Sequence, residues 1–175
     1  MKRLFRSAFA WLLLAALLCA AVWLERATVR QEEIRAASGE PVFIIDGDSL
    51  RLGGREIRIA AIDAPEYRQS CTDEAGRSWP CGKEARAALE TLARADGLTC
   101  TKVAEDRYGR VLGHCRTAQG DIAAALARQG WALGARDRRF AEPAAQVAEA
   151  KRARRGIWRG THQHPADWRN AQRGT

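Results

Sequence analysis

The 175-residue sequence predicts a single α+β domain, a small β-barrel with helices packed around it, preceded by an N-terminal apolar segment. Three patterns support this: short apolar runs joined by glycine turns, stretches with apolar residues at helical spacing, and one charge-free apolar run near the start. Once that run and a polar C-terminal tail are set aside, the remaining length suits one hydrophobic core.

The N-terminal segment directs the chain to a membrane. Basic residues 1–6 precede the apolar run 8–24, whose 17 residues carry no charge. This length is short for a spanning helix and slightly long for a signal-peptide core, so it leaves a retained anchor and a cleaved signal both open. The small-x-small cleavage site is poorly formed, which favours the anchor. Both alternatives place the rest of the chain on the periplasmic or extracytoplasmic face of an inner membrane, or secrete it after cleavage.

The expected organisation has five parts: a cytoplasmic basic region 1–6, a membrane segment 7–24, a spacer 25–40, a domain 41–158 and a polar tail 159–175. Within the domain, an apolar run at 42–45 and the alternating Leu50 and Leu52 lead to the turn dipeptide Gly53-Gly54. A return strand over 56–62 would complete an antiparallel hairpin.

The rest of the domain predicts further strands and helices. The chain shows a loop over 67–81, a helix from Gly82 to Gly97, a second hairpin from 98–103 and 111–116, a helix that Asp121 caps, and a helix over 143–155. Several short strands, one inserted helix and two terminal helices are typical of a five-stranded OB-type barrel with about three α-helices. Barrels of this kind bind nucleic acids and oligosaccharides on a strand face.

Cysteine usage agrees with export. Apart from Cys19 in the apolar segment, the sequence has four cysteines, an even number that suits an oxidising compartment. Three pairings are possible. The spacings favour Cys71 with Cys81 across a surface loop and Cys100 with Cys115 across a hairpin.

The charge balance gives modest support for a polyanionic partner. The whole chain carries +8, and without Lys2, Arg3 and Arg6 it has 26 basic against 21 acidic side chains, a net charge of +5. Nucleic acid or an anionic lipid surface would suit this excess, although many proteins with neither partner carry as much.

Two acidic clusters mark the candidate site. Asp46 and Asp48 follow the first apolar run, and Asp63 and Glu66 end its antiparallel partner, so the hairpin brings the clusters together. Crowded carboxylates repel one another, and a hard divalent cation relieves that repulsion. Oxygen ligands select calcium or magnesium over zinc. Each cluster taken alone is also typical of an ordinary turn.

Arginines near these acids favour a functional site over an ordinary turn. Arg58 lies on the hairpin opposite the apolar Ile57 and Ile59, and Arg110 ends a turn that also carries Arg107. A guanidinium group presents a planar fork that fits phosphate oxygens. Two arginines beside a carboxylate-bound cation therefore indicate a phosphodiester substrate.

Five motifs in order resemble the thermonuclease, or staphylococcal-nuclease-like, family over about residues 42–158. They are Ile45-Asp46-Gly47-Asp48-Ser49, the pair Ile57-Arg58-Ile59 and Ile62-Asp63-Ala64-Pro65-Glu66, Asp106-Arg107-Tyr108-Gly109-Arg110, Leu126-Ala127-Arg128-Gln129-Gly130-Trp131-Ala132, and Gly156-Ile157-Trp158. The resemblance implies an OB-fold nuclease that uses Ca²⁺ to cleave DNA and RNA with little sequence specificity, and we expect a monomer.

The resemblance also implies roles for individual residues. Calcium would be held by Asp48, Asp63 and the backbone carbonyl of Ala64, Glu66 would act as general base or position the attacking water, and Arg58 and Arg110 would stabilise the phosphate. Asp46 would lie behind the ligands, and Arg107 and Tyr108 are possible substrate contacts.

The sequence departs from the family at two places. Ala64 stands where well-known members carry threonine, but the expected ligand there is the main-chain carbonyl. Base-stacking tyrosines are not evident after Trp131, where Arg136, Arg138 and Arg139 either hold the phosphate backbone or form a solvated loop.

Two further sets of residues bear on the interpretation. His162 and His164 lie on the expected tail, where we expect no function, and Trp79, Trp131 and Trp158 are expected in packing. The rival to a nuclease is a catalytically silent OB module that binds nucleic acid or an envelope protein. Such a module should have lost the acids or the arginines, which are all present here.

Overall fold

The computed structural model describes residues 11, 14–20, 32–36 and 40–174. The chain forms two units, Met1–Glu32 and the compact domain Glu33–Thr175. In the first unit the described residues 11 and 14–20 are helical. Across the described residues, no helix combines the length and the apolar character needed to cross a membrane. Much of the segment 7–24, where we expected an anchor, lies outside the described residues.

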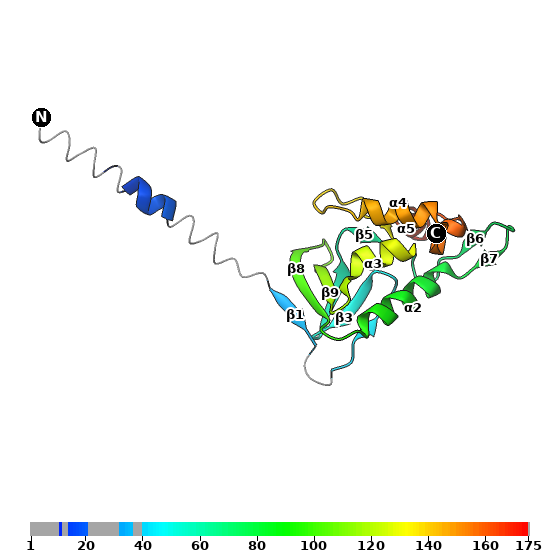
Figure 1. Ribbon diagram of the computed structural model, residues 1–175, viewed down its shortest axis with the longest axis horizontal. Coiled ribbons are helices and arrows are strands. Elements are labelled where there is room, and N and C mark those ends of the chain that lie inside the picture. Colours follow the sequence, from blue (N-terminus) through cyan, green and yellow to red (C-terminus); the bar gives the residue numbers. More distant parts are fainter. Residues whose placement is uncertain (1–10, 12–13, 21–31, 37–39, 175) are drawn as a thin grey trace, which may run out of the picture. The chain divides into compact units, whose positions relative to one another are not determined.

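The domain is built on a curled mixed sheet that fits the expected OB-type α+β fold (Figure 1). Its strands follow the order β1-β8-β9-β4-β3-β2, with β10 pairing β9. They are β1 (Glu33–Arg35), β2 (Phe43–Ile44), β3 (Ser49–Leu52), β4 (Arg55–Ile59), β8 (Thr99–Glu105), β9 (Val111–Thr117) and β10 (Gly120–Asp121). The only parallel pair within this sheet as described is β4 with β9, whose register sets Arg58 opposite Leu112.

The two predicted hairpins are confirmed. Leu52 of β3 pairs with Arg55 of β4. The intervening Gly53 and Gly54 have φ of +55° and +69°, a left-handed conformation that glycine adopts without strain. In the second hairpin, β8 pairs antiparallel with β9 and Cys100 faces Cys115.

Two shorter sheets lie beside the main sheet. The first pairs β5 (Ile62–Asp63) with β11 (Leu133–Gly134), and the second orders β12 (Gly160–Thr161), β6 (Cys71–Asp73) and β7 (Ser78–Trp79). The expected loop over 67–81 therefore contains a small hairpin, and the expected count of five strands is exceeded. Main-chain pairing stabilises these two- and three-residue strands, and a side-chain pattern that short carries no detectable periodicity.

Four α-helices belong to the described part of the domain. They are α2 (Cys81–Ala93), α3 (Ile122–Gln129), α4 (Ala144–Arg152) and α5 (Pro165–Arg173), and a 3₁₀ helix, η1, spans Gly156–Arg159. Helix α3 begins as predicted, because the Asp121 side chain accepts a hydrogen bond from the Ala124 amide, and it ends at Gly130 with φ of +82°.

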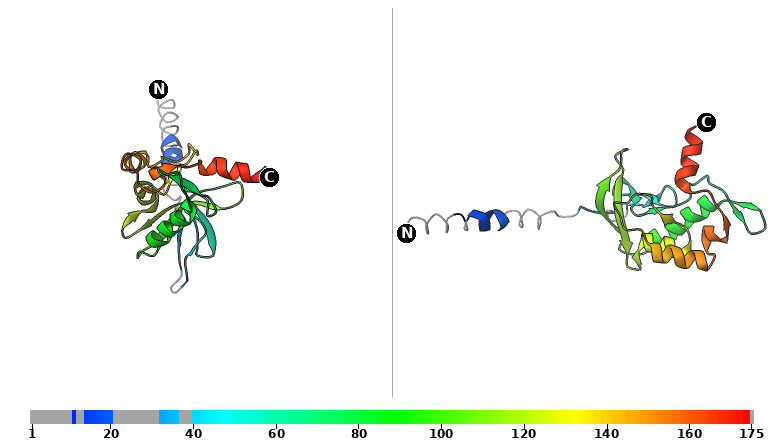
Figure 2. Two further views of the ribbon diagram at one scale, coloured as in Figure 1. Left: turned by 90° about the vertical axis from the view of Figure 1, so that its right-hand side faces the viewer. Right: turned by 90° about the horizontal axis from the view of Figure 1, so that it is seen from above.

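Both ends of the domain differ from the expectation. The predicted spacer contains β1, which pairs with β8 and buries Ile34, so the compact unit begins at Glu33 rather than at residue 41. The predicted polar tail forms β12 and α5. In both views of Figure 2, α5 projects from the rest of the domain with its carboxyl end outward. Strand pairing and ion pairs, rather than apolar burial, hold most of these elements in place. Their sequences therefore contain few apolar residues from which they could have been predicted.

The main core fills the space between the curled sheet and helices α2 and α3. Its largest buried side chains include Leu50, Leu52, Ile57, Ile59, Leu89, Ile122 and Leu126. A second cluster joins Cys71, Cys81 and Ile157 to Trp79, Trp131 and Trp158, which confirms that these three tryptophans are packing residues. The acidic clusters therefore lie at the ends of strands that a packed core supports.

Candidate functional site

The Asp48 side chain is buried, and Gly47 before it permits the close packing around it. The carboxylate is 1% exposed, and its Oδ2 accepts a 2.8 Å hydrogen bond from the Ala64 amide. A Cβ atom at Gly47 would lie 2.8 Å from the Cβ atoms of both Ala64 and Ala85, too close for any other residue without a shift. Gly47 thus lets the first acidic cluster pack against the second, as the hairpin argument predicted.

Arg58 joins the two buried acids. From β4, its Nη1 donates to Asp48 Oδ1 at 2.8 Å and its Nη2 donates to Asp63 Oδ1 at 2.5 Å. Burial of Asp48, and to a lesser extent the neighbouring Asp46 and Asp63 carboxylates, raise the pKa of Asp48 to about 7, although Arg58 opposes this rise. Asp46 Oδ1 accepts a hydrogen bond from the Asp48 amide at 3.0 Å. These buried carboxylates need cationic partners.

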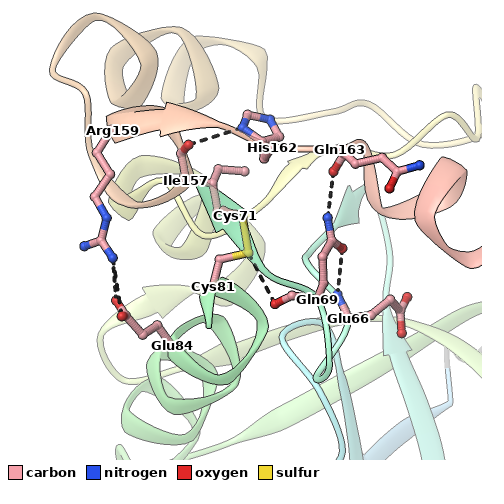
Figure 3. Close-up of a disulfide and its surroundings, with 9 residues drawn as sticks. All are labelled: Glu66, Gln69, Cys71, Cys81, Glu84, Ile157, Arg159, His162 and Gln163. Carbon is pink, nitrogen blue, oxygen red and sulfur yellow. Dashed lines mark hydrogen bonds and ion pairs between the residues drawn. A yellow bond between two sulfur atoms is a disulfide. The ribbon is translucent and has the colours of Figure 1, made fainter. Parts of the chain in front are cut away.

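Glu66 follows β5 on a loop that buried polar contacts fix. Gln69 is fully buried, and its side-chain oxygen accepts from the Glu66 amide at 3.2 Å while its side-chain nitrogen donates to the Gln163 carbonyl at 2.7 Å. Figure 3 shows Gln69 between these two groups. The start of α2 packs directly on the loop, because a Cβ atom at Gly82 would lie 1.7 Å from the Glu66 carbonyl oxygen.

A disulfide closes the same loop. Cys71 and Cys81 are bonded, and so are Cys100 and Cys115, which confirms both favoured pairings. Cys81 is the first residue of α2, and its Sγ lies 3.5 Å from the Gln69 carbonyl oxygen (Figure 3). The covalent link therefore ties the Glu66 loop to a helix of the core.

Arg169 of α5 occupies the acidic site, and it was missed in the sequence. Its Nη1 donates to Asp63 Oδ1 at 2.9 Å and to Glu66 Oε1 at 2.6 Å, while Nη2 donates to Asp63 Oδ2 at 3.2 Å. Partial burial opposes the shift, but these hydrogen bonds raise the pKa of the Arg169 guanidinium further above its ordinary value. Arg58 and Arg169 together engage both oxygens of Asp63.

The start of α5 also brings a histidine to the site. His164 Nδ1 accepts a hydrogen bond from the Ala166 amide as the helix cap, and it lies 3.6 Å from Asp63 Oδ2. Burial lowers the pKa of His164, although the Asp63 carboxylate opposes this. We expected His164 on a polar tail beyond the domain, and this position is wrong, because α5 lies against the acids. Pro165 at the first turn and Asp167 behind it were the available sequence signals for a helix start.

The turn between β8 and β9 supplies the remaining arginines. Asp106 organises it, accepting hydrogen bonds from the amides of Tyr108 and Arg110 at 2.9 and 3.0 Å and from Arg110 Nε at 2.8 Å. The Arg110 side chain faces the same pocket as Arg58. That pocket has a volume of about 570 Å³ and is lined by Arg58, Arg107, Tyr108, Arg110, Trp168, Arg169, Gln172 and Arg173.

The predicted ligand set is assembled only in part. Among the described residues, no three His, Cys, Asp or Glu side chains are placed to hold a metal ion together. Asp48 and Asp63 are nonetheless joined through the Arg58 guanidinium, and the amide of Ala64, the residue after Asp63, donates to Asp48. Two carboxylates and a main-chain carbonyl would leave further positions open for water or phosphate oxygens, which suits calcium, since it takes oxygen ligands in flexible numbers.

The basic segment after Trp131 does not face this pocket. Arg136 makes a bidentate pair with Asp167 of α5 at 2.7 and 2.8 Å, and Arg139 pairs with Asp137. Arg136 therefore fastens α5 to the segment that follows β11. We expected this segment either to contact phosphate or to form a solvated loop. The structure adds a third role, because Arg136 positions α5.

A small curled sheet with two buried acids, a nearby glutamate and a pocket rich in arginine is an arrangement suited to binding a phosphodiester. Residues 56–160 match the family described as Staphylococcal nuclease homologue. The chain therefore belongs to the staphylococcal-nuclease-like family. The matched residues contain Arg58, Asp63, Glu66 and Arg110, and α5 lies beyond them.

Three relatives illustrate the range of the family. Micrococcal nuclease of Shigella flexneri is 33% identical over 156 residues, which cover 77% of this chain and 82% of the relative. The succinoglycan biosynthesis protein ExoI of Rhizobium meliloti is 35% identical over 135 residues, 74% of this chain and 71% of the relative. Staphylococcal-like nuclease CAN1 of Arabidopsis thaliana is 29% identical, and the match covers 79% of this chain but only 40% of the plant protein.

Proposed function

We propose that this chain is a calcium-dependent nuclease that hydrolyses phosphodiester bonds of DNA and RNA with little sequence specificity. One observation carries the proposal: Asp48, Arg58, Asp63 and Glu66, from separate strands and loops, converge beside a pocket that Arg110 also lines. Membership of a family that includes proteins named as nucleases supports it.

Calcium would be held by Asp48, Asp63 and the Ala64 carbonyl. Both carboxylates are almost completely buried, so their ionised forms require a nearby cation, and oxygen donors favour a hard metal ion. When bound, the ion would polarise the phosphate and stabilise its developing charge. Asp63 is already engaged by Arg169, so that guanidinium must move aside for the metal to reach both Asp63 oxygens.

The remaining steps belong to side chains of the protein. Glu66 is only partly buried, so water reaches its carboxylate. Once the Arg169 guanidinium has moved away from Glu66, this carboxylate would accept a proton from the attacking water. Arg58 and Arg110 would donate hydrogen bonds to the non-bridging phosphate oxygens. The hydrogen bond that Arg110 Nε donates to Asp106 holds the Arg110 side chain in place, which lowers the cost of ordering it.

The test uses the purified full-length chain with single-stranded DNA and RNA, with calcium and with a chelator. We expect calcium-dependent cleavage, a loss of at least about 100-fold in kcat for Glu66→Gln, and a comparable loss for Arg110→Ala. Glu90→Gln, at a partly exposed acid of α2, and Arg94→Ala, at an exposed arginine that follows α2, are the matched controls and should retain activity. Cleavage that is insensitive to chelation, or to Glu66→Gln and Arg110→Ala combined, would overturn the nuclease assignment.

The rival function, a silent module that binds nucleic acid or an envelope protein, has one observation in its favour. Arg169 neutralises Asp63 and Glu66, and a permanent contact would leave both unavailable for catalysis. Binding of DNA without cleavage, in the wild type and in Arg169→Ala alike, would select the silent module.

We also propose that the domain is exported, either anchored at the outer face of the inner membrane or secreted. The basic and apolar N-terminus and the two disulfides support export. Mass spectrometry of the mature N-terminus would distinguish a retained anchor from a cleaved signal, and a protein recovered from the cytoplasm with reduced cysteines would contradict both.

A further inference from the structure

Helix α5 forms one side of the arginine-lined pocket beside the acids. Trp168, Arg169, Gln172 and Arg173 face Arg58, Arg107, Tyr108 and Arg110 of the barrel across about 570 Å³, a volume typical of small-ligand sites. Because Arg58 and Arg169 also contact Asp63, the pocket is continuous with the candidate catalytic site. A substrate bound in this pocket would therefore lie against α5.

The five arginines of this pocket divide into two groups. Three are paired with acids: Arg58 with Asp48 and Asp63, Arg110 with Asp106, and Arg169 with Asp63 and Glu66. For Arg107 and Arg173, the described residues offer no carboxylate within ion-pair distance. Two uncompensated guanidinium groups in one pocket attract an anion with oxygen acceptors, and a phosphate group fits their fork geometry.

Tyr108 holds these two guanidinium groups near each other. Arg173 Nη1 donates to the Tyr108 hydroxyl at 3.2 Å, and the Arg107 guanidinium carbon lies 4.9 Å from the centre of the tyrosine ring. Hydrogen bonding from Arg107, and less strongly from Arg173, lowers the pKa of the Tyr108 hydroxyl. Tyr108 is 62% exposed, so the space beside its ring and the two arginines is open to solvent.

Ion pairs, rather than apolar burial, hold α5 in this position. Pro165 is its only fully buried residue among those described, and the helix is fastened by Asp167 to Arg136 and by Arg169 to the acids. Trp168 therefore does not serve a core: it lines the pocket and presents an aromatic surface there. Aromatic side chains beside a basic groove are the usual platform for nucleotide bases.

We propose that α5 is the second wall of the substrate-binding site, in which Arg173 and Arg107 bind a phosphodiester group adjacent to the scissile one and Trp168 stacks on the neighbouring base. This inference rests on the proposed function. It supplies an aromatic base contact that the segment after Trp131 lacks, and it places the contact beyond the family-matched residues 56–160.

The test measures binding separately from cleavage. The full-length chain is titrated against a fluorescein-labelled oligothymidylate of eight nucleotides in chelator, and the dissociation constant is followed by anisotropy at several salt concentrations. Arg173→Ala should weaken binding about 5- to 10-fold and reduce the slope of log affinity against log salt by about 0.7, the value for one lost phosphate contact on a single strand. Arg173→Lys should restore most of the slope.

Trp168→Ala should weaken binding about 10-fold without changing the salt slope, because stacking involves no counterion release. Arg152→Ala removes the same charge from the exposed end of α4, away from the pocket, and should change neither quantity. Circular dichroism and thermal unfolding that match the wild type would establish that each variant is folded.

The possible outcomes separate this inference from the proposed function. Wild-type affinity and salt slope in Arg173→Ala, or an equal loss in Arg152→Ala, would overturn the role of α5 even if calcium-dependent cleavage is observed. The predicted losses without any cleavage would support the binding site and contradict the nuclease. A loss in Arg173→Ala that Arg173→Lys fails to restore in slope would exclude a phosphate contact.

Discussion

Replacing Arg169 by alanine should tighten calcium binding, because the guanidinium group and the metal ion require the same carboxylate. In the structure Arg169 makes two hydrogen bonds to Asp63 and one to Glu66. A calcium ion that coordinates Asp63 must displace the first two. The wild-type affinity therefore includes the cost of breaking them, and the alanine variant avoids that cost.

The magnitude follows from those contacts. A hydrogen bond to a charged partner contributes about 1.5–3 kcal/mol net. The Arg169 side chain is 30% exposed, so solvent screening places the pair near the lower end of that range. About 1.4 kcal/mol corresponds to a tenfold change in an equilibrium constant. We therefore expect the calcium dissociation constant to fall about tenfold in Arg169→Ala.

Isothermal titration calorimetry of the full-length chain with calcium, without nucleic acid, measures this directly. Arg173→Ala removes the same charge from α5 without a contact to the acids, so it reports the general electrostatic effect. Arg169→Lys keeps the charge but loses the fork, and its affinity should lie between those of wild type and Arg169→Ala. Equal affinities in Arg169→Ala and Arg173→Ala, or weaker binding in Arg169→Ala, would refute competition between the guanidinium and calcium.

Three further predictions concern the supports of the site. Burial raises the pKa of Asp48 to about 7, from about 3.9 in an unfolded chain, so the protonated carboxyl favours folding and this contribution is lost as pH rises through about 7. In urea unfolding with chelator, the stability advantage of Asp48→Asn over wild type should therefore grow by about 2–3 kcal/mol between about pH 5 and pH 8. A difference that stays constant with pH would contradict this. Replacing Cys71 and Cys81 by serine should lower the free energy of unfolding by about 2–3 kcal/mol, whereas Cys19→Ser, at an exposed free cysteine, should not. Gln69→Leu removes the bonds that hold the Glu66 loop and should lower kcat about tenfold with the fold retained by circular dichroism; unchanged turnover would show that the loop does not depend on them.

Most regular elements of the barrel were predictable because their signals are local. The alternation of Leu50 and Leu52 before Gly53-Gly54 predicted the first hairpin, and the cap at Asp121 predicted α3. We did not predict strand β1, because it is three residues long and buries a single side chain, that of Ile34. Its stability comes from pairing with β8, a partner more than sixty residues away.

The acids and arginines of the site were also predictable as a set. Turn residues and a shared hairpin bring Asp48, Asp63 and Arg58 together, and the contacts confirm that they meet. Their chemical roles remain predictions. Arg169 was not predictable in the same way, because its partners Asp63 and Glu66 lie more than a hundred residues earlier and no local pattern marks the contact.

Local sequence was thus sufficient for the hairpins, the amphipathic helices, the disulfide pairs and the types of side chain at the site. Each depends on neighbours within one turn, one hairpin or one loop. The position of α5, the engagement of Asp63 by two guanidinium groups and the pocket shared by Trp168 and Arg173 required the folded chain. Those contacts are polar and long-range, so their energies depend on distances that arise only after the sheet and the C-terminal segment have come together.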